Sequence, residues 1–79
     1  MNKKLKDLEK KVREDIALDR YKAACEQIVH AELGIEFLTT QAGKDLEGEN
    51  AAKNEVLKYE HILCVKKAEK EFLEKKLTA

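Results

Sequence analysis

The chain has 79 residues, of which 41% are charged and 5% aromatic, with three glycines and no proline, a composition typical of one small domain of long helices. Sixteen basic residues balance sixteen acidic ones, which argues against a general nucleic-acid-binding protein. No apolar run approaches the ~20 residues that span a bilayer, and the N-terminus has no signal-peptide core, so we expect a cytoplasmic protein.

Residues 2–14 form an N-terminal arm with a narrow apolar stripe in a highly charged segment. The three- and four-residue spacing of the stripe is that of a coiled-coil seam. A helix this polar is marginal by itself, so we expect the arm to fray or to dock on a neighbour. Its candidate partner contacts are Lys3, Lys4, Leu5, Leu8, Lys10, Lys11 and Val12.

A longer seam begins at Ala17 and continues to Ala42 with alternating steps of four and three residues. It is out of phase with the arm, which indicates either a bend or interruption near residues 13–19 or a different neighbour for the arm. Beside it runs a second stripe, and two apolar stripes on one helix imply two neighbours. The second stripe consists of Leu18, Cys25, Val29, Leu33 and Phe37.

Gly34 interrupts this helical pattern at a cost of about 1 kcal/mol relative to alanine. It is either a C-cap that ends the helix early or a position that a partner helix approaches closely. We predict a continuous helix, because Ile35, Leu38 and Ala42 keep the phase of the seam.

The stretch from Gly43 to Glu49 predicts a tight reversal between two helices. Gly43 suits the left-handed residue that ends a helix, and Asp45 suits the N-cap of the next one. Glu47 and Glu49 would then lie at the positive end of that second helix. The chain is therefore predicted to fold as an antiparallel helical hairpin.

The second predicted helix covers roughly residues 46–77, and its apolar middle, Val56 to Val65, should be its most buried part. With Ala42 opposite Leu46, the hairpin pairs Ala31 with Leu57 and brings Cys25 and Cys64 to one level. These cysteines are either a disulfide or two buried free thiols, and the expected compartment favours free thiols.

We expect an all-α fold in which one domain, residues 1–79, forms two long helices and assembles as a homodimeric four-helix bundle. The apolar stripes exceed what one helix pair can cover, and a bare hairpin of this size has a small core. The residues expected in the core and dimer interface are Tyr21, Ile28, Val29, Leu33, Phe37, Val56 and Leu63.

Charge is unevenly distributed along the predicted hairpin. Residues 1–13 hold six basic and two acidic side chains, and residues 66–79 hold five and three, so the open end is basic. Residues 32–60, around the turn, hold seven acidic and three basic side chains. The basic end, with Lys66, Lys67 and Lys70, is either a solvated surface or a contact for an acidic partner or nucleic acid.

No catalytic motif is recognisable. His30 and His61 have nearby glutamates but lack the Glu-x-x-His spacing of di-metal bundles, and the chain has no serine, Gly-rich loop or Cys-x-x-Cys pair. We therefore expect no enzyme, cofactor or metal, but a helical protein that binds, scaffolds or inhibits another macromolecule, a role that suits a phage- or mobile-element-encoded regulator. The alternatives are a nucleic-acid-associated protein and a metal-binding bundle.

Overall fold

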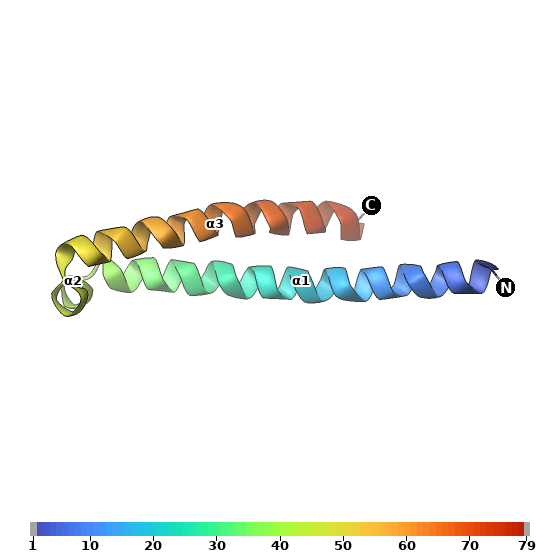
Figure 1. Ribbon diagram of the computed structural model, residues 1–79, viewed down its shortest axis with the longest axis horizontal. Coiled ribbons are helices and arrows are strands. Elements are labelled where there is room, and N and C mark those ends of the chain that lie inside the picture. Colours follow the sequence, from blue (N-terminus) through green and yellow to red (C-terminus); the bar gives the residue numbers. More distant parts are fainter. Residues whose placement is uncertain (1, 79) are drawn as a thin grey trace.

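The computed structural model describes residues 2–78 and consists of three helices in that range. They are α1 (Asn2–Leu38), α2 (Gln41–Glu47) and α3 (Glu49–Thr78). Helices α1 and α3 run antiparallel, and the short α2 joins them across the closed end (Figure 1). The molecule measures 63 × 17 × 15 Å, an extended shape. These observations confirm the predicted all-α helical hairpin.

The chain reverses at the predicted place, but through a helix instead of a tight turn at Gly43–Asp45. Thr40 caps the start of α2, because its hydroxyl accepts a hydrogen bond from the Gly43 N–H at 3.1 Å. Gly43 is buried inside α2, where a Cβ would lie 2.9 Å from the Phe37 carbonyl carbon. Gly43 is therefore needed for close packing against α1, and the prediction that it ends a helix is wrong.

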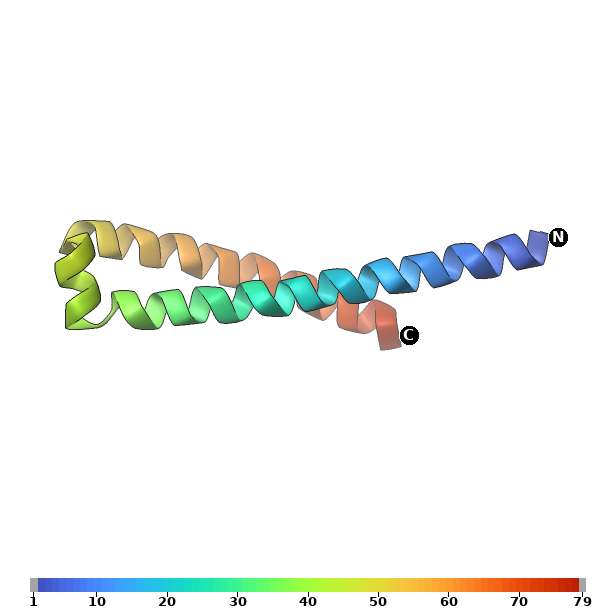
Figure 2. The ribbon, with the colours of Figure 1, turned by 90° about the horizontal axis from the view of Figure 1, so that it is seen from below.

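The boundary between α2 and α3 is Gly48, which adopts a φ of 87°. A positive φ costs glycine little, since it has no Cβ. Asp45 was predicted to cap the following helix, but it lies within α2 and accepts a hydrogen bond from the Gln41 side-chain amide at 2.8 Å. Glu49 does lie in the first turn of α3, as predicted. Figure 2 shows that α1 and α3 diverge toward α2 and cross nearer the open end.

Helix α1 is continuous through Gly34 and through residues 13–19. The first observation confirms the predicted continuity, and the second excludes an interruption between the arm and the seam. A Cβ on Gly34 would lie 2.7 Å from the Tyr59 Cε2 atom, so the missing side chain makes room for an aromatic ring of α3. The arm extends past the end of α3 (Figure 1).

The core between α1 and α3 is small and contains several alanines. The buried apolar side chains are Ala24, Ile28, Ala31 and Leu38 of α1 and Ala52 and Leu73 of α3. Among the described residues no polar side chain is buried. Small side chains let two helices approach closely, but they bury little apolar area for each residue.

The middle of α3 is more exposed than the sequence predicts. Leu57 and Val65 are 63% and 46% exposed, because one neighbouring helix covers only one side of α3. Leu57 was predicted to face the buried Ala31, so that pairing is wrong, and the contact of Gly34 with Tyr59 defines the actual register. The helical connection separates the two long helices more than a tight turn does. Both cysteines are free, Cys25 half-buried and Cys64 exposed.

Candidate interaction surfaces

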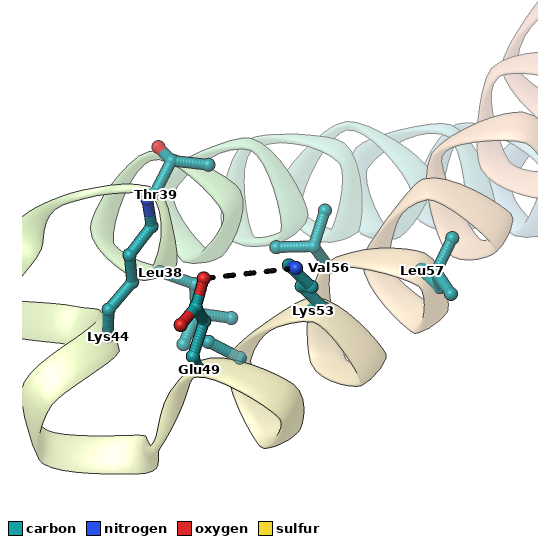
Figure 3. A pocket seen from close by; sticks show the side chains of 8 residues that line it. Leu38, Thr39, Lys44, Glu49, Lys53, Val56 and Leu57 are labelled. Atoms are coloured by element: carbon teal, nitrogen blue, oxygen red, sulfur yellow. Dashed lines mark ion pairs between the residues drawn. The ribbon is translucent and has the colours of Figure 1, made fainter.

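The closed end of the hairpin contains an apolar groove of about 370 Å³, which we call the closed-end groove. Its walls are the apolar side chains Leu38, Ala52, Val56 and Leu57, with Thr39, Lys44, Glu49 and Lys53 also lining it. Figure 3 shows Leu38 of α1 and Val56 of α3 with the ion pair of Lys53 and Glu49 beside them. The divergence of α1 and α3 opens this groove, so it depends on α2.

The closed-end groove is apolar in its interior and has an exposed ion pair at its rim. The Lys53 Nζ atom lies 3.8 Å from the Glu49 carboxylate, and both side chains are more than two-thirds exposed, at 71% and 72%. Such a pair contributes at most about 1 kcal/mol and separates readily. The groove can therefore accept an apolar side chain of another molecule while its lysines meet acidic groups.

The predicted core and dimer interface separates into two groups. Ile28 is buried between the helices, and Tyr21, Val56 and Leu63 are half-buried. Val29, Leu33 and Phe37 are 54%, 59% and 46% exposed. Val29 and Leu33 lie on the side of α1 that faces away from α3, which we call the outer face of α1. Phe37 instead lines a pocket together with Glu55 and Tyr59 of α3. Within one chain, nothing in the described part covers this face.

The N-terminal arm carries its predicted contact residues in exposed positions. Leu5, Leu8 and Val12 are 54–60% exposed. Together with Glu9 and Arg13 they line a shallow groove with a volume of about 550 Å³. The arm lysines Lys3, Lys4, Lys10 and Lys11 are also exposed.

At the open end, a second groove of about 450 Å³ lies between the two long helices. Ile16 and Ala17 of α1 line it together with Phe72 and Leu73 of α3. The Lys76 ammonium lies 5.7 Å from the centre of the Phe72 ring, a cation–π arrangement. The remaining lining residues are the basic side chains Lys10, Arg13, Arg20 and Lys76 together with Glu14 and Leu77.

The basic residues predicted on α3 lie apart from the arm. The Lys66 ammonium is 4.0 Å from the Glu69 carboxylate, and Lys70 lies near Tyr21, well along α1 from the arm. Desolvation and then the negative charge of Glu74 raise the pKa of the Tyr21 phenol above its ordinary value. Lys66 and Lys70 therefore lie apart from the arm, whereas Lys10 and Lys76 share the groove at the open end.

The two histidines have different surroundings. The His30 and Tyr59 rings lie with their centres 6.3 Å apart and tilted by 55°, and His30 and His61 are both exposed. Across residues 2–78, no three His, Cys, Asp or Glu side chains are placed to hold a metal ion together.

The sequence identified the exposed side chains of α1 but did not identify the closed-end groove. Leu57 lines this groove and is 63% exposed, but its place in an apolar run of the sequence indicates only that its side chain favours burial. None of the helices between residues 2 and 78 has the length and apolar character needed to cross a membrane. Comparison with protein-family models, curated proteins and solved structures finds no match.

Proposed function

We propose that this protein is a non-enzymatic helical interaction protein, which assembles as a homodimeric four-helix bundle and binds another macromolecule to scaffold or inhibit it. One observation carries the proposal. Of the described residues, twelve large apolar side chains are at least 46% exposed, and they are distributed over all three helices. Extended apolar surface of this kind is typical of proteins that function in contact with another molecule.

The energetics of a single hairpin support assembly. The buried apolar set has six members, of which three are alanines. Full burial of one more leucine, valine or phenylalanine contributes about 1.5–3 kcal/mol, so covering even a few exposed side chains is comparable with the stability of a small domain. A second copy of the chain can supply this cover.

The closed-end groove is the surface we assign to the other macromolecule. It is apolar inside, and Lys44 and Lys53 at its edge favour a protein segment with an apolar anchor and neighbouring acidic groups. The alternative function, binding of nucleic acid, has less support, because Lys66 and Lys70 lie apart from the arm lysines and Lys66 is paired with Glu69.

The partner is tested by affinity capture from the native host with three forms of the protein. Leu57→Glu places a charge in the groove, and Val65→Glu makes the same kind of change at an exposed position outside it. We expect wild type and Val65→Glu to retain one protein at near-equal stoichiometry and Leu57→Glu to lose it. Capture that is unaffected by Leu57→Glu, or no stoichiometric protein with wild type, contradicts the proposal. Light scattering tests the dimer against the 9.1 kDa chain mass.

A further inference from the structure

The outer face of α1 has a regular pattern that extends over nearly the whole helix. Leu5, Leu8 and Val12 lie at one end of this face, and Val29 and Leu33 lie at the other. All five side chains are 54–60% exposed. Steps of three and four residues connect them in a single heptad phase, directly opposite the seam of Ala24, Ala31 and Leu38 that contacts α3.

The same spacing continues between the two apolar ends through four exposed charged residues, Asp15, Asp19, Lys22 and Glu26. We call the whole row the outer seam. It is therefore apolar at both ends and charged in the middle. An uninterrupted helix is required to connect these positions, and α1 is continuous from Asn2 to Leu38. A heptad row drifts by about 20° per heptad on a straight helix, so the paired helices coil around one another to keep it in contact.

We propose that the outer seam binds the outer seam of a second copy in an antiparallel α1–α1 contact, with Leu8 opposite the partner's Leu33 and Val12 opposite the partner's Val29. This inference rests on the proposed homodimer and names its surface and register. Because the outer seam lies opposite the α3 contact, the four helices lie in a row in this dimer and not around one shared core. The two-fold axis passes near Arg20 and Tyr21. Each apolar contact then occurs twice, as a symmetric interface requires.

Charge selects the antiparallel direction. In this register Asp19 faces the partner's Lys22, and on the flank of the seam Lys11 approaches the partner's Glu32. A parallel, in-register pair would also match apolar residues, but it would place each charged side chain beside its own copy and one basic arm beside the other. Like charges opposite one another are destabilising, so the antiparallel pair is favoured.

A shift of one heptad in one direction keeps only Leu5 opposite the partner's Val29, and a shift in the other direction keeps no apolar match. Val12 would face the partner's Lys22 in one shifted register, and Val29 would face the partner's Asp19 in the other. The register is therefore defined by apolar contacts at both ends. In this dimer the arm leucines and Val12 contact the second copy of the chain, and the closed-end groove stays accessible to a different partner.

The register also contains one unfavourable layer, which provides a sharp test. Asp15 faces the partner's Glu26, twice in the dimer. Glu26→Lys or Asp15→Lys converts both like-charge pairs into opposite-charge pairs, and each single variant should tighten dimerisation roughly tenfold, the ratio that about 1.4 kcal/mol produces. The double variant restores like charges and should return the dissociation constant to near wild type. Glu71→Lys makes the same charge change at an exposed site on α3 and should leave it within about twofold.

Dissociation constants are measured by sedimentation equilibrium in low salt, with circular dichroism to confirm helicity. A covalent test uses Leu18→Cys in a Cys64→Ser background, since residue 18 approaches the partner's Cys25 on the flank of the seam, as Lys11 approaches the partner's Glu32. Mild oxidation should give a dimer linked between positions 18 and 25, and Cys64→Ser alone should remain unlinked. Within one helix these positions are about 10 Å apart along the axis, too far for an intrachain disulfide.

The possible results separate this inference from the broader proposal. The register is supported if each single charge reversal lowers the dissociation constant of the dimer, if the double variant returns it to near the wild-type value, and if the disulfide between positions 18 and 25 forms. If the chain dimerises but its dissociation constant does not change with the charge reversals and the disulfide does not form, the register is wrong while the homodimer stands. A chain that remains monomeric at ~100 μM, a concentration at which micromolar dimers form, overturns both the register and the homodimer, whatever the affinity capture shows.

Discussion

Replacing Gly34 by alanine tests the contact that defines the register of α1 and α3. Alanine in the middle of a helix is about 1 kcal/mol more favourable than glycine. Here, however, the new Cβ would lie 2.7 Å from Cε2 and 2.8 Å from Cζ of Tyr59, against an ordinary carbon–carbon contact of about 3.5–4.0 Å. The ring must therefore move by about 1 Å, and such overpacking costs about 1–3 kcal/mol. The expected net result is a loss of about 1 kcal/mol in the free energy of unfolding.

The sign should reverse when the ring is removed. In a Tyr59→Ala background, Gly34→Ala should stabilise the protein by about 1 kcal/mol, because only the helix propensity remains. The coupling between the two sites is then about 2 kcal/mol in a double-mutant cycle. Urea unfolding followed by circular dichroism measures it, at one fixed protein concentration because dimerisation adds to the apparent stability. If Gly34→Ala stabilises the wild-type background as much as the Tyr59→Ala background, the ring does not lie against Gly34 and the register is wrong.

Three further predictions concern the helix ends and the ionisation of one phenol. Thr40→Ala removes the N-cap of α2 and should cost about 1 kcal/mol in urea unfolding, whereas the exposed neighbour substitution Thr39→Ala should cost less; equal losses would argue against the cap. Gly48→Ala should lower the free energy of unfolding by about 1–3 kcal/mol from backbone strain alone, since φ is 87° and nothing lies within 4 Å of the added Cβ. Asn50→Ala is the matched control. A Gly48→Ala protein as stable as this control would exclude the strain. The pKa of Tyr21 is raised above 10.0, so the folded state holds this proton more tightly and its stabilising contribution is lost as pH rises above 10. Tyr21→Phe should therefore lose less stability than wild type between pH 9 and pH 11, and identical losses would contradict the assignment.

Much of the fold could be predicted from local pattern. The three- and four-residue spacing of apolar residues predicted α1 and α3, and the unbroken phase across Gly34 predicted that α1 continues there. The reversal was predicted at Gly43–Glu49 and lies between Leu38 and Glu49 in the structure, but its helical form was not predicted. Gly43 and Asp45 fit a generic turn by type, whereas the structure uses Thr40 as the cap and Gly48 as the positive-φ residue. Several residue types satisfy each of these roles, so local preference alone does not choose among them.

The candidate surfaces show the same division. Exposure of Val29, Leu33 and Phe37 could be anticipated, because they lie off the main seam and one neighbour cannot cover them. The closed-end groove could not be anticipated, since it exists only because α2 holds α1 and α3 apart. Burial in the middle of α3 was overestimated for a related reason. An apolar run indicates which side chains favour burial, but not whether a neighbour is present to cover them.

By itself, the sequence determined that the chain is helical, where it doubles back, and which side of α1 faces α3, because these depend on spacing along the chain. The tertiary structure decided the register, the role of each glycine and the position of the groove. These depend on how closely two backbones approach, as where Gly34 meets the Tyr59 ring and where Gly43 meets the Phe37 carbonyl. Such distances arise from contacts between residues far apart in the chain, which periodicity does not encode.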